Sequence, residues 1–215
     1  MKLYSLDNSP FCAPVRLAVY AKGLDLPIEP PPGGLKSDEY KRASLTGNIP
    51  CLVLDDGTPI PESAVIIDYL DEKFPAKPLK PATPEARARE ALIRRIAEHD
   101  LLLAQVAFFY RMQVGEAAAA APETLAKFER GLGLIETLMA EGGYIAGPEL
   151  TTADCILIPA LMGVAAFAPA IGRPSLLADH PKVPAYLGRA QQHPAAAKVL
   201  GELQAALAAS GISLG

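Results

Sequence analysis

The feature that most constrains the fold is a hairpin with polar residues at both of its ends. Residues 51–54 and 58–60 are mostly apolar and flank Asp55-Asp56-Gly57, which is typical of a tight turn between two antiparallel strands. Ile49-Pro50 enters the hairpin, and Glu62-Ser63 leaves it at the start of a segment with helical spacing. We therefore expect these two dipeptides to lie close together in one small unit.

Such a unit can hold both charges of an amino-acid-like ligand. The free N–H groups at the start of a helix, together with the Ser63 hydroxyl, attract a carboxylate, and Glu62 can hold an ammonium group. If the Ile49-Pro50 bond is cis, the turn leaves the main chain of Ile49 free to pair with an extended peptide. Two simpler interpretations stay open: a trans Pro50 that only enters an edge strand, and Glu62 or Ser63 acting only as a helix cap.

A proline-rich linker at residues 77–84 divides the chain into two parts. Residues 1–76 mix short strands with helices, whereas residues 85–215 have helical patterns throughout, so we predict an α/β domain followed by an all-α domain. Leu150-Thr151-Thr152-Ala153-Asp154 predicts a capping box at the start of a buried helix. The helices expected in the second part span 85–112, 122–139, 152–168, 183–192 and 195–208.

Composition excludes several classes of function. The net charge is −4 without a dense Lys/Arg cluster, so we expect no nucleic-acid partner. Residues 155–172 carry no charge but are rich in Ala, Gly and Pro, which predicts a buried helix and no membrane partner. Cys12, Cys51 and Cys155 are an odd number without paired spacing, and the first residues lack the apolar run of a signal peptide. A cytoplasmic location without disulfides is expected, and no metal site is predicted.

Ser9 and Cys12 follow the first predicted strand, at residues 2–6. Ser9 can sit at a helix start with Pro10 after it, where its hydroxyl and the helix dipole would stabilise a bound thiolate. Pro14 predicts that the regular helix begins there, after an irregular first turn. Ser9 and Cys12 have the spacing of a two-cysteine redox motif, but serine stands in place of the first cysteine, which is the attacking residue of such a motif. We therefore expect Cys12 to be a small buried residue.

These motifs together resemble the cytosolic glutathione S-transferase family, in its bacterial serine-type form. The resemblance covers nearly the whole chain and implies a thioredoxin-like N-terminal domain at residues 1–76 and an all-helical domain at 85–215. Its motifs are Ser9-Pro10-Phe11, Ile49-Pro50 with the hairpin, Glu62-Ser63-x-x-Ile66-x-x-Tyr69-Leu70, and Thr151-x-Ala153-Asp154.

The resemblance also implies which residues would hold glutathione as a co-substrate. Ser9 would be the catalytic residue, because its hydroxyl would bond the glutathione sulfur and favour the thiolate. Ile49 would pair through its main chain with the cysteinyl part, and Glu62 and Ser63 would hold the γ-glutamyl ammonium and carboxylate. The residues expected to bind glutathione are Lys36, Asn48, Ile49, Pro50, Glu62 and Ser63.

Some positions depart from the family pattern or compete for a role. Lys36 matches a position that often approaches the glycine carboxylate, but Asn48 stands where many relatives carry a basic residue, which predicts a weaker hold there. Tyr4, on the first strand, is a rival to Ser9 as the activating hydroxyl. If Cys12 were the reactive residue, the protein would instead be a thiol-disulfide or dehydroascorbate-type reductase.

The expected function is a glutathione transferase that attacks a small hydrophobic electrophile. Residues 108–112 would line the electrophile pocket or belong to the core. Asp100 is expected to be an exposed helix residue, and the resemblance offers the alternative that it reaches a ligand across a dimer interface. The resemblance implies a homodimer in which each N-terminal domain packs on the partner's helical domain. A glutathione-dependent isomerase and a non-catalytic regulatory or scaffold protein on the same fold are the alternatives.

Overall fold

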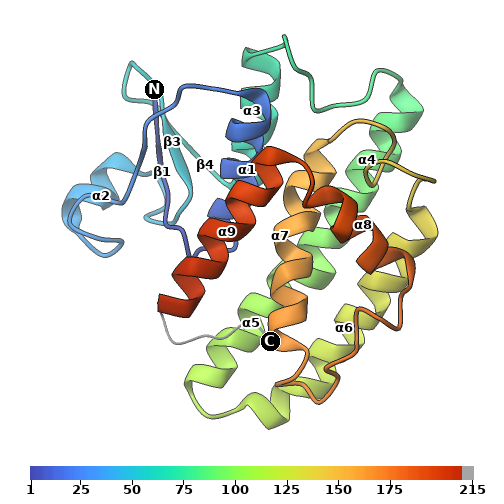
Figure 1. Cartoon of the computed structure of the whole chain (residues 1–215). Coiled ribbons are helices and arrows are strands. Elements are labelled where there is room, and N and C mark those ends of the chain that lie inside the picture. Colours follow the sequence, from blue (N-terminus) through green and yellow to red (C-terminus); the bar gives the residue numbers. More distant parts are fainter. Residues whose placement is uncertain (210–215) are drawn as a thin grey trace.

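A computed structural model describes residues 1–209. Its first part contains a four-stranded sheet in the order β2-β1-β3-β4 (Figure 1). β1 pairs parallel with β2 and antiparallel with β3, and β3 pairs antiparallel with β4. The predicted hairpin is confirmed, with Gly57 at a φ of 86° in its turn, where glycine is favoured. The strands are β1 Lys2–Tyr4, β2 Ile28–Glu29, β3 Cys51–Val53 and β4 Pro59–Pro61.

Three helices cover this sheet. α1 (Cys12–Lys22) and α3 (Ser63–Lys73) pack against each other, and α2 (Asp38–Ala43) lies at the other side of the strands (Figure 1). α1 ends at Gly23, which has a φ of 66° and whose N–H bonds back to the last turn, a helix end for which glycine is favoured. On the α2 side, Tyr40 packs edge-on against Tyr4 with ring centroids 5.5 Å apart.

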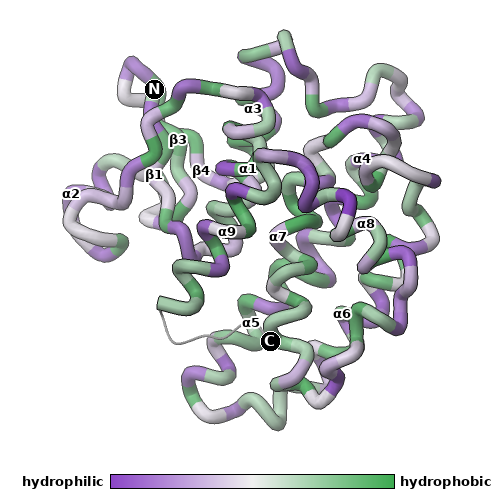
Figure 2. The backbone as a smooth tube through the Cα atoms, in the orientation of Figure 1, coloured by the Kyte–Doolittle hydropathy of each residue, from purple (hydrophilic) through white to green (hydrophobic). Residues whose placement is uncertain are grey.

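The second part is helical throughout residues 84–209, apart from its connections. The expected long helix is present, but its middle six residues are π-helical. α7 is the centre of the unit, because every residue from Thr152 to Leu161 is buried and α7 contacts α1, α4 and α9 (Figure 2). The helices are α4 Pro84–Ile96, the π-helical η1 Ala97–Leu102, α5 Leu103–Gln113, α6 Ala117–Leu138, α7 Thr152–Phe167, α8 Lys182–Ala190 and α9 Pro194–Ala209.

One buried hydrophobic cluster extends through both parts, from Leu3 to Leu203. Within residues 1–209, none of the helices has the combination of length and apolarity needed to cross a membrane. α7 is therefore an apolar helix enclosed by other helices, and its burial follows from its position between α1 and α4.

The capping box at the start of α7 is confirmed and does more than cap. Thr151 donates to Asp154 Oδ2 from its N–H (2.8 Å) and from its hydroxyl (2.6 Å). Asp154 Oδ1 also accepts the N–H of Ile145 (2.9 Å) and the hydroxyl of Tyr186 (2.7 Å). A single buried carboxylate thus joins the start of α7 to the preceding loop and to α8.

The proline-rich segment 77–84 is held against both parts. Asp71 Oδ1 accepts the N–H of Leu79 and the Nζ of Lys22, each at 2.7 Å. The Leu79 carbonyl accepts the N–H of Thr152, at the start of α7, at 3.0 Å. These bonds, and the burial of Leu79, fix where the chain passes from the sheet to the helices.

Candidate functional site

The sheet register brings the predicted motifs to one end of the sheet. Tyr4 pairs with Cys51, Cys51 pairs with Pro61, and Tyr4 also pairs with Glu29. Neighbouring strands lie about 4.8 Å apart. The turn after β1, Pro50 before β3, Glu62 after β4 and the segment after β2 therefore emerge side by side.

Ser9 is held at this end by a turn and by the start of α1. Its N–H donates to the Leu6 carbonyl at 3.1 Å, and its own carbonyl accepts the N–H groups of Cys12 and Ala13. The hydroxyl oxygen accepts the N–H of Cys12 at 3.3 Å, which leaves the hydroxyl proton able to be donated to a ligand atom. The regular helix begins at Cys12, before Pro14, because a proline in the first turn removes an N–H that would have no helical partner there.

Cys12 is fully buried, as expected. Burial raises the pKa of its thiol, and the nearby Ser9 and Arg16 offset this only in part. A reactive cysteine needs the opposite environment, an exposed thiol with a lowered pKa. The structure therefore disfavours the reductase alternative.

Tyr4, the rival to Ser9, belongs to the core under α2. It is 5% exposed and packs against Tyr40 and Cys51, and the Nζ of Lys2 lies 4.8 Å from its ring centroid. Its ring is thus used in packing on the sheet.

The Ile49-Pro50 bond is cis. Ile49 is half-buried, and within residues 1–209 its main-chain N–H and C=O make no hydrogen bond. The carbonyl of the preceding residue, Asn48, accepts the hydroxyl of Tyr40 at 2.6 Å, while the Asn48 side chain is exposed. The buried Tyr40, whose pKa is raised above its ordinary value by burial, thus holds the chain just before Ile49. The main chain of Ile49 is free to pair with an extended ligand.

Glu62 and Ser63 leave the start of α3 open. Glu62 is exposed and has a φ of 72° and a ψ of 121°, a conformation that residues other than glycine rarely adopt. No side chain caps the helix, so the simpler capping interpretation is wrong for both residues. The N–H groups of the first turn remain available beside the hydroxyl of Ser63, a residue that is 9% exposed.

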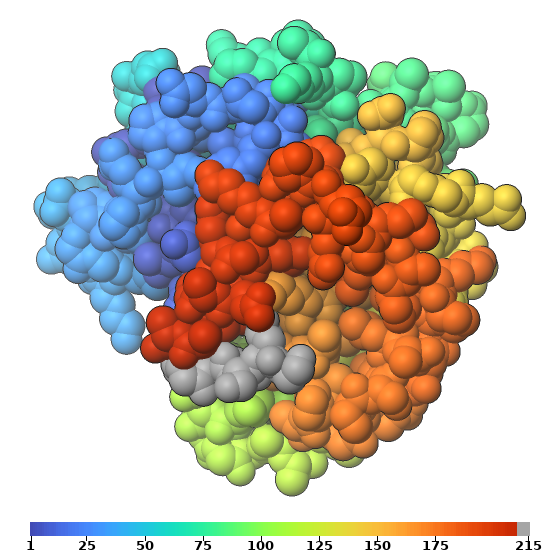
Figure 3. Space-filling model, viewed as in Figure 1, coloured from blue at the N-terminus to red at the C-terminus, as the bar shows by residue number. Residues whose placement is uncertain are grey.

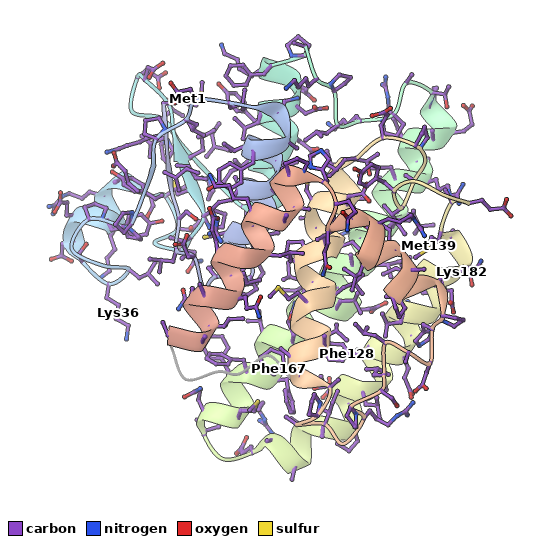
Figure 4. All side chains as sticks on the ribbon, in the orientation of Figure 1. Met1, Lys36, Phe128, Met139, Phe167 and Lys182 are labelled. Atoms are coloured by element: carbon purple, nitrogen blue, oxygen red, sulfur yellow. The ribbon has the colours of Figure 1, made fainter. Side chains whose placement is uncertain are left out.

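Lys36 lies in the connection between β2 and α2. Its side chain is exposed and extends clear of the ribbon below α2 (Figure 4). Within residues 1–209 it makes no hydrogen bond or ion pair. The segment after β2 begins at the same end of the sheet as Ser9 and Glu62, but in the described part of the chain the structure records no hydrogen bond or ion pair between Lys36 and either residue.

The aromatic run on α5 divides between core and surface. Phe108 is fully buried and Phe109 is half-buried; their rings lie 5.8 Å and 6.5 Å from that of Phe167, at the end of α7 (Figure 4). Tyr110 and Met112 are 66% and 37% exposed. Phe109, Tyr110 and Met112 therefore remain candidates for contact with an apolar ligand.

The expectation that Asp100 is exposed is wrong. This residue is 6% exposed, not an exposed helix residue, and both of its carboxylate oxygens lie 2.6 Å from the Arg130 Nη1 on α6. It lies in the π-helical η1, close to Gly131, where an added Cβ would come within 2.7 Å of the Asp100 Cβ. The absence of a side chain at Gly131 allows η1 and α6 to approach closely and bury Asp100, while the paired Arg130 side chain remains exposed.

Two residues that shape the site were not singled out from the sequence. Tyr40 was missed because the helix around it has a weak pattern. Arg16 carries a stronger signal, since it is a lone charge in the apolar stretch between Cys12 and Val19. A charge at a position expected to be buried predicts fixed partners.

The hollows found in the described part of the chain lie away from this end of the sheet. Two hollows of about 230 Å³ each share Met1 at the opposite end of β1, and neither is lined by a candidate residue. Within residues 1–209, no three His, Cys, Asp or Glu side chains are grouped so that they could hold a metal ion.

Comparison with known proteins defines the class to which this fold and site belong. Residues 3–78 match the glutathione S-transferase N-terminal domain, and residues 118–189 match the glutathione S-transferase C-terminal domain. The chain belongs to the glutathione S-transferase family.

Individual relatives carry different names. The chain is 30% identical to the maleylacetoacetate isomerase of Pseudomonas aeruginosa over 80% of its length and 84% of that protein. It is 31% identical to glutathione S-transferase Z1 of Arabidopsis thaliana, with 76% of each chain covered. Its fold is that of a glutathione S-transferase from Methylobacterium radiotolerans solved with glutathione sulfonate, at a TM-score of 0.78 and 24% identity over 92% of this chain and 93% of that one.

Proposed function

We propose that this chain is a cytoplasmic glutathione transferase that activates the thiol of bound glutathione for attack on a small hydrophobic electrophile. One observation carries the proposal. The uncapped start of α3, with Glu62 in a strained conformation beside it, lies at the same end of the sheet as the Ser9 hydroxyl and the unpaired main chain of Ile49.

The groups present suit glutathione chemically. The first-turn N–H groups of α3 and the Ser63 hydroxyl would receive the γ-glutamyl carboxylate, and Glu62 would receive the ammonium. Ile49, after Asn48 and before the buried Pro50, would pair with the cysteinyl unit. Lys36 would need to turn inward to meet the glycine carboxylate, so its contribution should be small.

Ser9 would act on the sulfur. Its hydroxyl proton can be donated to a thiolate, and the thiolate would also face the positive end of α1. Both effects favour the charged form of the thiol and lower its pKa. Residues 1–76 would thus hold glutathione, and residues 85–215 would hold the electrophile against it, with Phe109, Tyr110 and Met112 as contacts.

Calorimetric titration with reduced glutathione tests the binding site. Glu62→Gln keeps the size of the side chain but removes its charge. The amide oxygen of glutamine can still accept from the ammonium, but the bond is then no longer between two charged groups, a difference of about 1–1.5 kcal/mol, so the dissociation constant should rise roughly 5- to 10-fold. Equal affinity in wild type and variant would place the ammonium elsewhere, and no binding heat at millimolar glutathione would favour a non-catalytic protein on this fold.

Steady-state kinetics test the role of Ser9. Ser9→Ala should lower turnover roughly 100-fold, as expected for the loss of one donor to a developing anion, with little change in glutathione affinity. Unchanged turnover would contradict the assignment of Ser9.

A glutathione-dependent isomerase is the second candidate, favoured by the name of the Pseudomonas relative. An isomerase returns glutathione unchanged, whereas a transferase consumes one thiol for each product. Titration of free thiol during turnover of each candidate substrate separates the two functions.

We also propose a homodimer. Val65 on α3 and Leu92 on α4 are 53% and 50% exposed, and a two-fold pairing that covered them would remove apolar surface from water. Light scattering on the purified chain is expected to give twice the mass of 22.6 kDa. A monomer at all working concentrations would refute the dimer without affecting the glutathione site.

A further inference from the structure

Arg16 forms hydrogen bonds to the segment just before the Ser9 turn. Arg16 is a residue of α1, and its side chain is buried, with only 1% exposed. Nη1 donates to the Ser5 hydroxyl at 3.0 Å and to the Leu6 carbonyl at 2.9 Å, and Nη2 donates to the Asp7 carbonyl at 3.0 Å. The same Leu6 carbonyl accepts the N–H of Ser9. One guanidinium therefore fixes three successive residues from which the Ser9 turn begins.

The Nε donor of this guanidinium reaches α9. Nε donates to Glu202 Oε2 at 3.0 Å. The other oxygen, Oε1, accepts the Tyr20 hydroxyl at 3.0 Å and lies 3.8 Å from the Lys198 Nζ. α9 lies along α1, and its atoms abut the N-terminal unit without a gap (Figure 3). Glu202 is thus held on both oxygens and fixes the orientation of Arg16.

We infer that Arg16, oriented by Glu202, is a positioning residue that ties the C-terminal helix α9 to the turn presenting Ser9. The planar fork of arginine reaches acceptors on two sides at once, from Nε and from both Nη atoms. A lysine would keep the charge but not this geometry. The inference rests on the proposed function for the role of Ser9, but the order of the turn can be measured without glutathione.

Cys12 reports on that order, because its buried thiol directly follows the turn and its N–H bonds the Ser9 hydroxyl. Arg16→Lys keeps the charge and loses the fork; Glu202→Leu removes the acceptor on α9. In the native protein, maleimide labelling of Cys12, followed by mass spectrometry, should be about 10-fold faster in both variants because the turn opens more often. Labelling of Cys155, buried in α7, should not change.

Lys22→Met is the matched control. Lys22 lies on the same helix, is 5% exposed, and pairs with Asp71 at 2.7 Å, at the end of α1 away from the Ser9 turn. Its replacement should lower stability without faster labelling of Cys12. In kinetics, the Arg16 and Glu202 variants should lose about 10-fold in kcat with the glutathione KM changed by less than about 2-fold, while the control keeps both values.

Each outcome decides the inference. Labelling of Cys12 in Arg16→Lys as slow as in wild type would overturn it, and so would equally fast labelling in Lys22→Met, because Arg16 would then only stabilise α1. If Arg16→Lys does not fold, Glu202→Leu decides. A wild-type protein without glutathione affinity but with the expected labelling would remove the proposed function and leave the positioning role in place.

Discussion

Glu62 offers a prediction in which stability and binding should change in opposite directions. Its φ of 72° is costly for any residue with a Cβ, by about 1–3 kcal/mol. Within residues 1–209 its side chain makes no hydrogen bond or ion pair that would offset this cost. The conformation is therefore retained for a reason other than stability of the chain alone.

Glu62→Gly should relieve this strain. Glycine adopts positive φ freely but loses about 0.5–1 kcal/mol more conformational entropy on folding. At the middle of both ranges the net gain is about 1 kcal/mol, which corresponds to a rise in Tm of about 2–4 °C for a chain of this size. Glutathione binding should be lost in the same variant, because the carboxylate that would hold the ammonium is gone.

Thermal unfolding by circular dichroism and calorimetric titration, on the same samples, measure both effects. Glu62→Ala is the control: it keeps the Cβ and hence the strain, so it should lose affinity without any rise in Tm. A marked fall in Tm for Glu62→Gly would show that the carboxylate stabilises the fold. Wild-type affinity in that variant would show that the strain has no part in glutathione binding.

Three other buried side chains, Tyr40, Cys12 and Glu90, each give a further prediction. Tyr40→Phe removes the hydroxyl that holds Asn48, a bond worth about 1 kcal/mol, so calorimetry should show a glutathione dissociation constant about 5-fold higher. Cys12→Ala should retain turnover, and native Cys12 should react with iodoacetamide far more slowly than a free thiol, because burial raises its pKa. Burial also raises the pKa of Glu90 above its unfolded value, so protonation of Glu90 stabilises the fold at low pH and this contribution is lost as pH rises through the folded pKa. Glu90→Gln, which imitates the protonated form, should therefore raise Tm more at about pH 8 than at about pH 4.

The fold could be predicted where short segments determine their own structure. Asp55-Asp56-Gly57 specifies a tight turn, Gly23 stops a helix, and Thr151 with Asp154 starts one, each within a few residues. Their order along the chain then indicates the α/β part and the helical part, because each element buries its apolar side against the next.

The start of α6 shows where a local rule fails. Pro122 predicts a first helical residue, but the helix begins at Ala117, and Pro122 lies inside it. Five alanines precede the proline, and alanine has the highest helix propensity, so they extend the helix despite the lost N–H. The burial of Asp100 could not be predicted either, because it depends on the close approach of η1 to Gly131, and helical spacing does not report π-helical turns.

In the candidate site, too, the residues placed by short local segments differ from those placed by long-range contacts. Ser9, Ile49, Glu62 and Ser63 could be proposed as site residues because each is placed by a turn or a helix start adjacent to it in sequence, and their roles in binding stay predictions. Lys36 could not be placed, since it lies in a connection without a regular element. The contact between Arg16 and Glu202 joins residues 186 positions apart, which no local pattern predicts.

That long-range contact bears on why serine at position 9 and a buried Cys12 belong together. Disulfide exchange requires a thiolate that can attack and a second thiol that can move to meet it. Here Arg16 and the turn bonds hold Ser9 in place, and Cys12 is enclosed behind it with its pKa raised by burial. Thiolate activation on a bound ligand requires the opposite, a fixed donor whose partner arrives from outside. The rigidity that α9 gives to the turn therefore favours chemistry on the thiol of a bound ligand over exchange at a thiol of the protein.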